Sequence, residues 1–342
     1  MLRILYGRSH SGKTRRLLSE LTAQARAGTS GLWLLVPEQL SHQAERTLCL
    51  AGGDEISRRA EVLSFTRLAA RVFAQAGGVS ARYLDKGGRL LTMALAVEQV
   101  RARLRLFAGR TPEGLTRLVT AVDEFKSYEI TPERLREAAG QTRGQLAVKL
   151  EELALLLESY DAACAHIALD PRQRLTRLRE ALSRSGLAEG RHVYIDGFSD
   201  FTAQERAVVE LLMQDAAELT ICLTCDDLQD GLDIFSAERE TAAALLRCAQ
   251  RRGVPAECIP MAADEGRPAP LRLVEQALLT RENRTAPAED AVGLYSAPDR
   301  VAECARAAGE MRRLAAGGLR WREMTLACPD EGCARVAAAV LR

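Results

Sequence analysis

Gly7-Arg8-Ser9-His10-Ser11-Gly12-Lys13-Thr14 is the stretch that decides the fold of this 342-residue chain. It fits the pattern G-x-x-x-x-G-K-[ST] of the phosphate-binding P-loop, in which successive backbone N–H groups surround an anion. The lysine of such a loop reaches the β- and γ-phosphates of a nucleotide, and the final hydroxyl binds Mg²⁺. A β-prone run at residues 3–6 precedes the loop, and a helical pattern of apolar residues follows it. The sequence therefore predicts a strand, a loop and a helix that bind ATP through these eight residues.

The overall composition is that of a globular chain with reduced thiols. Hydrophobic residues make up 47% of the sequence and charged residues 27%, with a formal net charge of +1. No apolar run approaches the roughly 20 residues that a membrane span needs, so we expect no membrane association. The chain enters a strand at once, without a signal peptide, and its nine cysteines lack the spacing of a disulfide framework. These features predict a cytoplasmic protein.

The alternation of strand and helix patterns divides the chain. Apolar strand-like runs alternate with helical patterns up to residue 84 and again over residues 188–280, which predicts one parallel sheet covered by helices on both faces. Between them, residues 85–187 contain long amphipathic helical patterns separated by glycine and proline. We therefore predict a P-loop core of residues 1–84 and 188–280, with an all-helical insertion at residues 85–187.

The last part of the sequence predicts the beginning of a second α/β domain at residues 290–342. Strands are expected at residues 292–295 and 324–327, and polar linkers at residues 262–270 and 281–289. Two strands cannot form a stable sheet of their own, and the final apolar helical pattern has no cap. The sequence therefore predicts that this domain is truncated and that the chain is the front part of something longer.

A second half of the nucleotide site is expected at Asp196. This carboxylate follows the apolar strand pattern of residues 193–195, and ligands gather at the carboxyl ends of strands in open α/β sheets. A P-loop needs such a carboxylate to hold Mg²⁺, so Thr14 and Asp196 are the predicted metal ligands. The next residue, Gly197, has no side chain that could activate water, a contribution typically worth about 10²–10⁴ in rate. We therefore assign no catalytic residue and expect slow ATP hydrolysis or none.

Three segments beyond the P-loop resemble motifs of superfamily 1 helicases of the UvrD type. Residues 36–46 resemble motif Ia, residues 64–71 resemble motif Ib, and residues 196–204 resemble the second motif. Within that superfamily, the combination GRxxSGKT, VPEQ, VLSFTRLA and IDGF is similar to the AddB family, the B subunits of bacterial AddAB helicase–nucleases. The resemblance runs from Leu2 to Arg342. It implies an α/β fold of the RecA-like, superfamily 1 helicase class of P-loop NTPases.

The resemblance also implies a function in DNA repair. AddAB is a heterodimer that unwinds and degrades double-stranded DNA ends for recombinational repair, and its B subunit recognises the Chi sequence as single-stranded DNA. An AddA-type partner subunit and single- and double-stranded DNA are therefore implied, with DNA contacts at motif Ib, residues Ser64, Phe65, Thr66 and Arg67. The family carries an iron–sulfur cluster in a C-terminal nuclease domain. That domain is absent from this sequence, so none of the nine cysteines is assigned to the cluster.

Three other functions stay open at this point. An active DNA-dependent ATPase or helicase would hydrolyse ATP on its own, but only six residues precede the P-loop, which leaves no room for the glutamine segment that holds adenine in active helicases. A small-substrate P-loop kinase would need an arginine-bearing lid, which the inserted helices could supply. A scaffold would keep the P-loop for packing alone. The leading hypothesis is a helicase–nuclease subunit that binds ATP, Mg²⁺ and single-stranded DNA with little motor activity.

Overall fold

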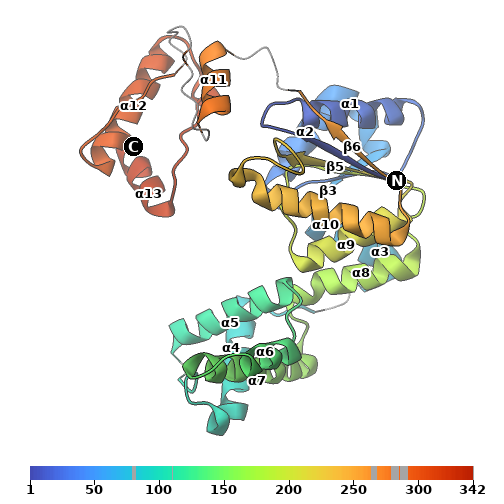
Figure 1. The fold of residues 1–342 in the computed structure, drawn as a ribbon, viewed down its shortest axis with the longest axis vertical. Helices are drawn as coiled ribbons and strands as arrows, with labels where there is room; N and C mark the ends of the chain where they lie inside the picture. The colour runs from blue at the N-terminus through green and yellow to red at the C-terminus, as the bar shows by residue number, and fades with distance from the viewer. Residues whose placement is uncertain (79–81, 110, 263–267, 279–284, 286–291, 342) are drawn as a thin grey trace. The chain divides into compact units, whose positions relative to one another are not determined.

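The computed structural model describes residues 1–78, 82–109, 111–262, 268–278, 285 and 292–341. The chain forms two compact units, Met1–Glu265 and Gly266–Arg342, which Figure 1 shows as ribbons. Within the described ranges, no helix combines the length and the apolar character that crossing a membrane requires. The P-loop lies in the first unit.

A six-stranded parallel sheet forms the centre of the first unit (Figure 1). Its strand order is β3-β2-β4-β5-β1-β6, so the strand that leads into the P-loop, β1, lies between β5 and β6. The register aligns Leu2 with Leu219 and Gly7 with Thr224 across β1 and β5. The predicted α/β fold with a parallel sheet is confirmed. The strands are β1 (Leu2–Gly7), β2 (Leu32–Leu35), β3 (Ala60–Leu63), β4 (His192–Ile195), β5 (Glu218–Thr224) and β6 (Ala256–Pro260).

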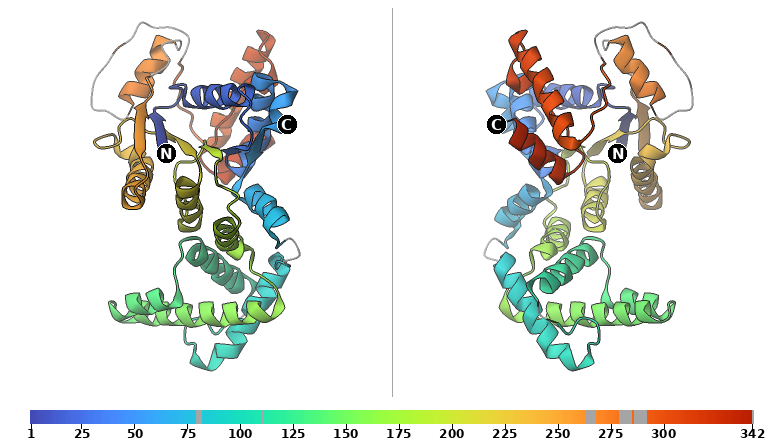
Figure 2. Two further views of the ribbon diagram at one scale, coloured as in Figure 1. Left: turned by 90° about the vertical axis from the view of Figure 1, so that its right-hand side faces the viewer. Right: turned by 90° about the vertical axis from the view of Figure 1, so that its left-hand side faces the viewer.

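Helices cover both faces of this sheet, because its central strands are apolar on both sides. The spacing of Leu17, Leu21 and Ala25 lets α1 bury one apolar stripe against the strands. One face packs against α1 (Lys13–Arg26) and α2 (Ser41–Gly52). The other face packs against α3 (Phe65–Ala76), α8 (Arg174–Ser185), α9 (Ala203–Asp215) and α10 (Ser236–Arg252) (Figures 1 and 2).

Four further helices of the first unit build a second hydrophobic core, separate from that of the sheet. Met93, Val97, Leu156 and Tyr160 are buried at its centre. Two of the helices begin with a threonine cap followed by proline, which fixes their starts at the breaks expected from the sequence. The helices are α4 (Lys86–Val100), α5 (Pro112–Ser127), α6 (Pro132–Gly140) and α7 (Gln145–Ile167).

The helix that follows, α8, joins the core of the sheet instead. Its buried residues Leu178, Ala181 and Leu182 belong to the cluster that covers the sheet, where α8 packs against α3 and α9. The helical insertion expected at residues 85–187 therefore contains two kinds of helix, four that pack with one another and one that packs on the sheet. The domain limits themselves stay a prediction.

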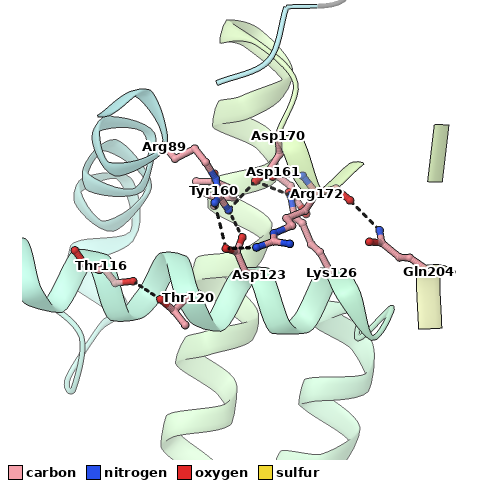
Figure 3. Close-up of polar contacts among 10 residues, drawn as sticks. All are labelled: Arg89, Thr116, Thr120, Asp123, Lys126, Tyr160, Asp161, Asp170, Arg172 and Gln204. Atoms are coloured by element: carbon pink, nitrogen blue, oxygen red, sulfur yellow. Dashed lines mark hydrogen bonds and ion pairs between the residues drawn. The ribbon is translucent and has the colours of Figure 1, made fainter. Parts of the chain in front are cut away.

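A network of charged side chains joins α4, α5 and the segment of residues 170–172 before α8 (Figure 3). Asp170 has no exposed surface, and its carboxylate accepts the backbone N–H of Arg172 at 2.8 Å. It lies 3.5 Å from the Arg89 guanidinium and 3.4 Å from the Lys126 ammonium. Arg89 and Arg172 also bind Asp123. Burial favours the neutral form of Asp123, but hydrogen bonds from these two arginines outweigh it and hold the pKa of Asp123 below its ordinary value.

The second unit consists of helices in its described part. The helices α12 and α13 pack together around Cys304, Cys333 and Ala337. The strands expected at residues 292–295 and 324–327 do not form, so the prediction of strands here was wrong. An extended segment becomes a strand by pairing with a neighbour, and Leu294 in the first segment is instead 99% exposed. The helices are α11 (Ala269–Ala277), α12 (Arg300–Ala316) and α13 (Glu331–Val340).

The remaining elements are short 3₁₀ helices, which turn the chain between longer elements. Most of the linker expected at residues 262–270, and nearly all of that at residues 281–289, lies outside the described residues. The 3₁₀ helices are η1 (Glu38–Leu40), η2 (Asp54–Arg58), η3 (Arg101–Arg103), η4 (Pro171–Gln173), η5 (Asp233–Phe235) and η6 (Trp321–Glu323).

Candidate nucleotide-binding site

The P-loop connects the end of β1 to the first residue of α1, as the motif requires. Two of its residues, His10 and Gly12, take left-handed backbone conformations with φ of +59° and +82°, which bend the loop around its own centre. At Gly7 a Cβ would lie 2.6 Å from both the carbonyl oxygen of Met261 and the hydroxyl of Ser11. Only glycine fits there, because the segment after β6 passes directly beside the loop.

Lys13 points into the loop. Its side chain is largely buried, and its ammonium donates to the carbonyl oxygens of Gly7 at 2.7 Å and Arg8 at 2.9 Å and to the Ser11 hydroxyl at 3.2 Å. A buried ammonium needs such oxygen partners. The phosphate oxygens of a nucleotide in the loop would be stronger partners of the same kind, because they carry full negative charge.

The structure brings the two predicted magnesium ligands together. The Thr14 hydroxyl donates a hydrogen bond of 2.7 Å to the carboxylate of Asp196, 182 residues further along the chain. The contact arises because β1 and β4 are parallel and are separated only by β5, so both end at the same edge of the sheet. Two hard oxygen donors at this point are what Mg²⁺ needs from a protein when phosphate oxygens and water complete its octahedron.

A cavity of about 550 Å³ opens beside these residues, within the ordinary size range of small-molecule sites. It is lined on one side by the P-loop with Asp196, and it extends to residues of β2 and α2. Sequence reasoning missed the contribution of α2, because nothing in the local pattern indicates which face of that helix meets α1. The α2 residues that line the cavity are Gln43, Ala44 and Thr47, joined by Leu40 from η1.

Gly197 explains why no second carboxylate follows Asp196 at this cavity. Its backbone is left-handed, with φ of +81°, and a Cβ there would lie 3.0 Å from Leu40 Cδ1 and 3.2 Å from Pro37 Cδ. A side chain at this position is therefore disfavoured by both conformation and space. Asp196 is the one carboxylate among the described residues that line the cavity. Elsewhere in the described chain, no group of three or more His, Cys, Asp or Glu side chains is arranged to hold a metal.

The four residues predicted to contact DNA are divided between the core and the surface. Ser64 is buried and caps α3 by accepting the backbone N–H of Arg67. Phe65 is only 6% exposed and belongs to the core of the sheet. Thr66 and Arg67 are exposed, and Arg67 forms an ion pair of 2.6 Å with Glu45. In this conformation only the last two residues of the set present side chains to solvent.

Comparison with known proteins gives a consistent result. Residues 4–272 match the family model described as "ADDB, N-terminal". Several curated relatives are named as the B subunit of an ATP-dependent helicase/deoxyribonuclease. The relative from Desulforudis audaxviator is 35% identical over 95% of this chain and 29% of its own length. The relative from Symbiobacterium thermophilum is 35% identical over 98% of this chain and 31% of its own length. The relative from Moorella thermoacetica is 34% identical over 96% and 30%. The chain thus spans about a third of the length of these relatives.

Proposed function

We propose, from the fact that this chain belongs to the AddB N-terminal family, that it is the nucleotide-binding front part of a helicase–nuclease subunit. In this proposal its sheet is the RecA-like, superfamily 1 core of that subunit and binds ATP with Mg²⁺. The observation that carries the proposal is the 2.7 Å contact between Thr14 and Asp196 beside a P-loop whose lysine points inward. This arrangement has the parts that P-loop proteins use to hold nucleotide phosphates.

Each residue of the site would have one task. The backbone N–H groups of residues 7–14 would surround the phosphates, and the positive end of α1 adds to their attraction. Lys13 would exchange its loop carbonyls for phosphate oxygens, and Thr14 and Asp196 would hold Mg²⁺. When bound, Mg²⁺ neutralises charge on the phosphates.

The carboxylate of Asp196 provides a direct test of this assignment. In the variant Asp196→Asn, we expect ATP binding to become about equally weak with and without Mg²⁺, because the amide keeps the shape of the side chain but loses its charge. Equilibrium titration with fluorescent ATP, at millimolar Mg²⁺ and in EDTA, measures this. Asp200→Asn is the matched control, since Asp200 lies in the same loop but does not line the cavity. An unchanged Mg²⁺ dependence in Asp196→Asn would contradict the assignment.

We propose further that the site binds ATP without efficient hydrolysis, because Gly197 leaves the water without a base. The variant Gly197→Glu supplies the carboxylate that DNA-dependent ATPases carry there, yet we expect no gain in phosphate release with or without single-stranded DNA, because the left-handed backbone and the crowding by Leu40 and Pro37 prevent the residue from positioning that carboxylate. A glutamate in this left-handed backbone conformation should instead lower the free energy of unfolding by about 1–2 kcal/mol. Phosphate release and denaturant unfolding measure the two effects, and Gly197→Ala separates the backbone strain from the charge. DNA-stimulated ATP hydrolysis by Gly197→Glu would contradict this expectation, because it would mean that one substitution makes the site an active motor.

The proposal for the whole protein follows the family resemblance of the sequence and the names of its relatives. We propose a cytoplasmic heterodimer with an AddA-type subunit that acts on double-stranded DNA ends, in which this chain binds single-stranded DNA during Chi recognition in recombinational repair. The nuclease domain and its iron–sulfur cluster would lie outside this sequence. An active DNA-dependent ATPase is the second candidate, and the absence of a carboxylate other than Asp196 among the described residues of the cavity argues against it.

A further inference from the structure

Three phenylalanines connect the nucleotide cavity with the segment predicted to contact DNA. Phe198 lines the cavity two residues after Asp196. Its ring lies 5.6 Å from the ring of Phe65, centroid to centroid, at an edge-to-face angle of 69°. Phe201 completes the cluster at 5.3 Å from Phe198 and 6.4 Å from Phe65. The cavity and the start of α3 therefore share a continuous aromatic contact.

The loop that carries Phe198 connects β4 to α9. It leaves β4 through the left-handed Gly197 and enters α9 through the Thr202 capping box. The Gln204 side chain then fixes α9 to the backbone carbonyl of Arg172 at 2.9 Å (Figure 3). Between these ends, Phe201 is buried in the core of the sheet, Phe198 packs against that core, and Thr241 donates a 3.4 Å hydrogen bond to the Ser199 carbonyl. A change at Asp196 would therefore reach the half-buried Phe198, two residues later, before it reaches the anchored Phe201.

Phe65, at the other end of this aromatic contact, belongs to the segment predicted to contact DNA. Phe65 is the first residue of α3, and its buried ring is unavailable for stacking on a base. Ser64 before it binds the Glu38 carboxylate and caps the helix, while Thr66 and Arg67 after it face solvent. A displacement of the Phe65 ring would therefore move the first turn of α3, where the exposed side chains are.

We propose that Phe198 is a positioning residue which, through its contact with Phe65, couples nucleotide binding in the cavity to DNA binding at the start of α3. The inference rests on the proposed function, because it needs both ligands. Filling the cavity changes the surroundings of Phe198, and the ring contact passes this change to α3. Coupling of this kind is reciprocal, so each ligand changes the affinity for the other by the same factor.

The test is a ligand-coupling cycle on the full chain. The Kd for a nonhydrolysable Mg²⁺·ATP analogue is measured with and without a saturating oligothymidylate of about 16 nucleotides, and the Kd for the oligonucleotide with and without the analogue. For each ligand, the Kd measured without the other ligand is divided by the Kd measured with it. In the wild type we expect these two ratios to agree and to differ from one by about fivefold or more. Phe198→Leu, Phe65→Leu and the double variant should all bring the ratio to within about twofold of one, because they remove the same contact.

Phe73→Leu is the matched control, since Phe73 lies on the same helix and is as deeply buried as Phe65 but is outside the cluster. It should keep the wild-type ratio. Wild-type coupling in folded Phe198→Leu would overturn the inference, and so would a wild type that binds both ligands with a ratio of one. A wild type that binds no nucleotide would overturn the proposed function as well. Phe198 is only half-buried, so Phe198→Leu provides the test even if Phe65→Leu fails to fold.

Discussion

Replacing Lys13 with alanine should weaken Mg²⁺·ATP binding by about 100-fold or more, which corresponds to about 2.7 kcal/mol. The ammonium is largely buried inside the loop, where its three oxygen partners hold it in place. A charge fixed in a partly desolvated site interacts with phosphate more strongly than one on the surface, and it is not screened in the same way by salt. Arg8, the other long cationic side chain of the loop, forms an ion pair with Asp226 and does not line the cavity. Equilibrium titration of both proteins measures the change.

The chain offers a matched control for this substitution. It contains four lysines, and Lys86 is an exposed one at the first turn of α4, outside the cavity. Lys86→Ala removes the same charge and should leave the Kd for Mg²⁺·ATP within about twofold, as expected of a surface charge. Equal Kd values for Lys13→Ala and the wild type, in proteins with the same thermal unfolding, would mean that the P-loop does not bind phosphate.

Replacing Asp170 with alanine should reduce the free energy of unfolding by about 3–5 kcal/mol, the usual cost of removing one partner from a buried charge cluster. Asp170 is completely buried and faces Arg89 at 3.5 Å and Lys126 at 3.4 Å. Its loss would leave the two cations with one fewer buried counter-charge between them. It would also remove the acceptor for the backbone N–H of Arg172, whose carbonyl oxygen accepts a hydrogen bond from the Gln204 side chain of α9.

Asp161 provides the comparison for this prediction. It contacts the same Lys126 ammonium at 2.6 Å, but its side chain is 42% exposed. Because the Lys126 ammonium keeps the carboxylate of Asp170 at 3.4 Å as its counter-charge, Asp161→Ala should cost no more than about 1 kcal/mol. Urea unfolding followed by circular dichroism measures both variants. Similar losses for the two would show that burial does not decide the strength of this network, contrary to our account.

The nucleotide half of the site could be predicted because its determinants are local. The P-loop motif fixes residues 7–14, and Asp196 follows a short apolar strand, so the parallel sheet alone brings Thr14 and Asp196 to one edge. The conformation of Gly197 follows from its neighbours Pro37 and Leu40, which are 160 and 157 positions away. The sequence shows that Gly197 offers no carboxylate after Asp196, but it does not show the steric reason for a glycine at this position.

The parts that sequence reasoning missed depend on tertiary contacts. The DNA contacts assigned by resemblance include Phe65, whose ring is buried and lies against the rings of Phe198 and Phe201. The part of the cavity lined by α2 depends on which face of α2 meets α1, and the helical pattern gives no information on that. The strands expected at residues 292–295 and 324–327 had the right composition, but a strand also needs a neighbour.

One measurement tests the central claim most directly, which is that the site holds ATP and does not consume it. The 342-residue chain is incubated with Mg²⁺ and radiolabelled ATP, separated from free nucleotide, and its bound nucleotide is quantified and identified. Our account predicts one nucleotide per chain, recovered as ATP, and none in Lys13→Ala. A folded wild type that retains no nucleotide, or one that returns it as ADP, would contradict the account.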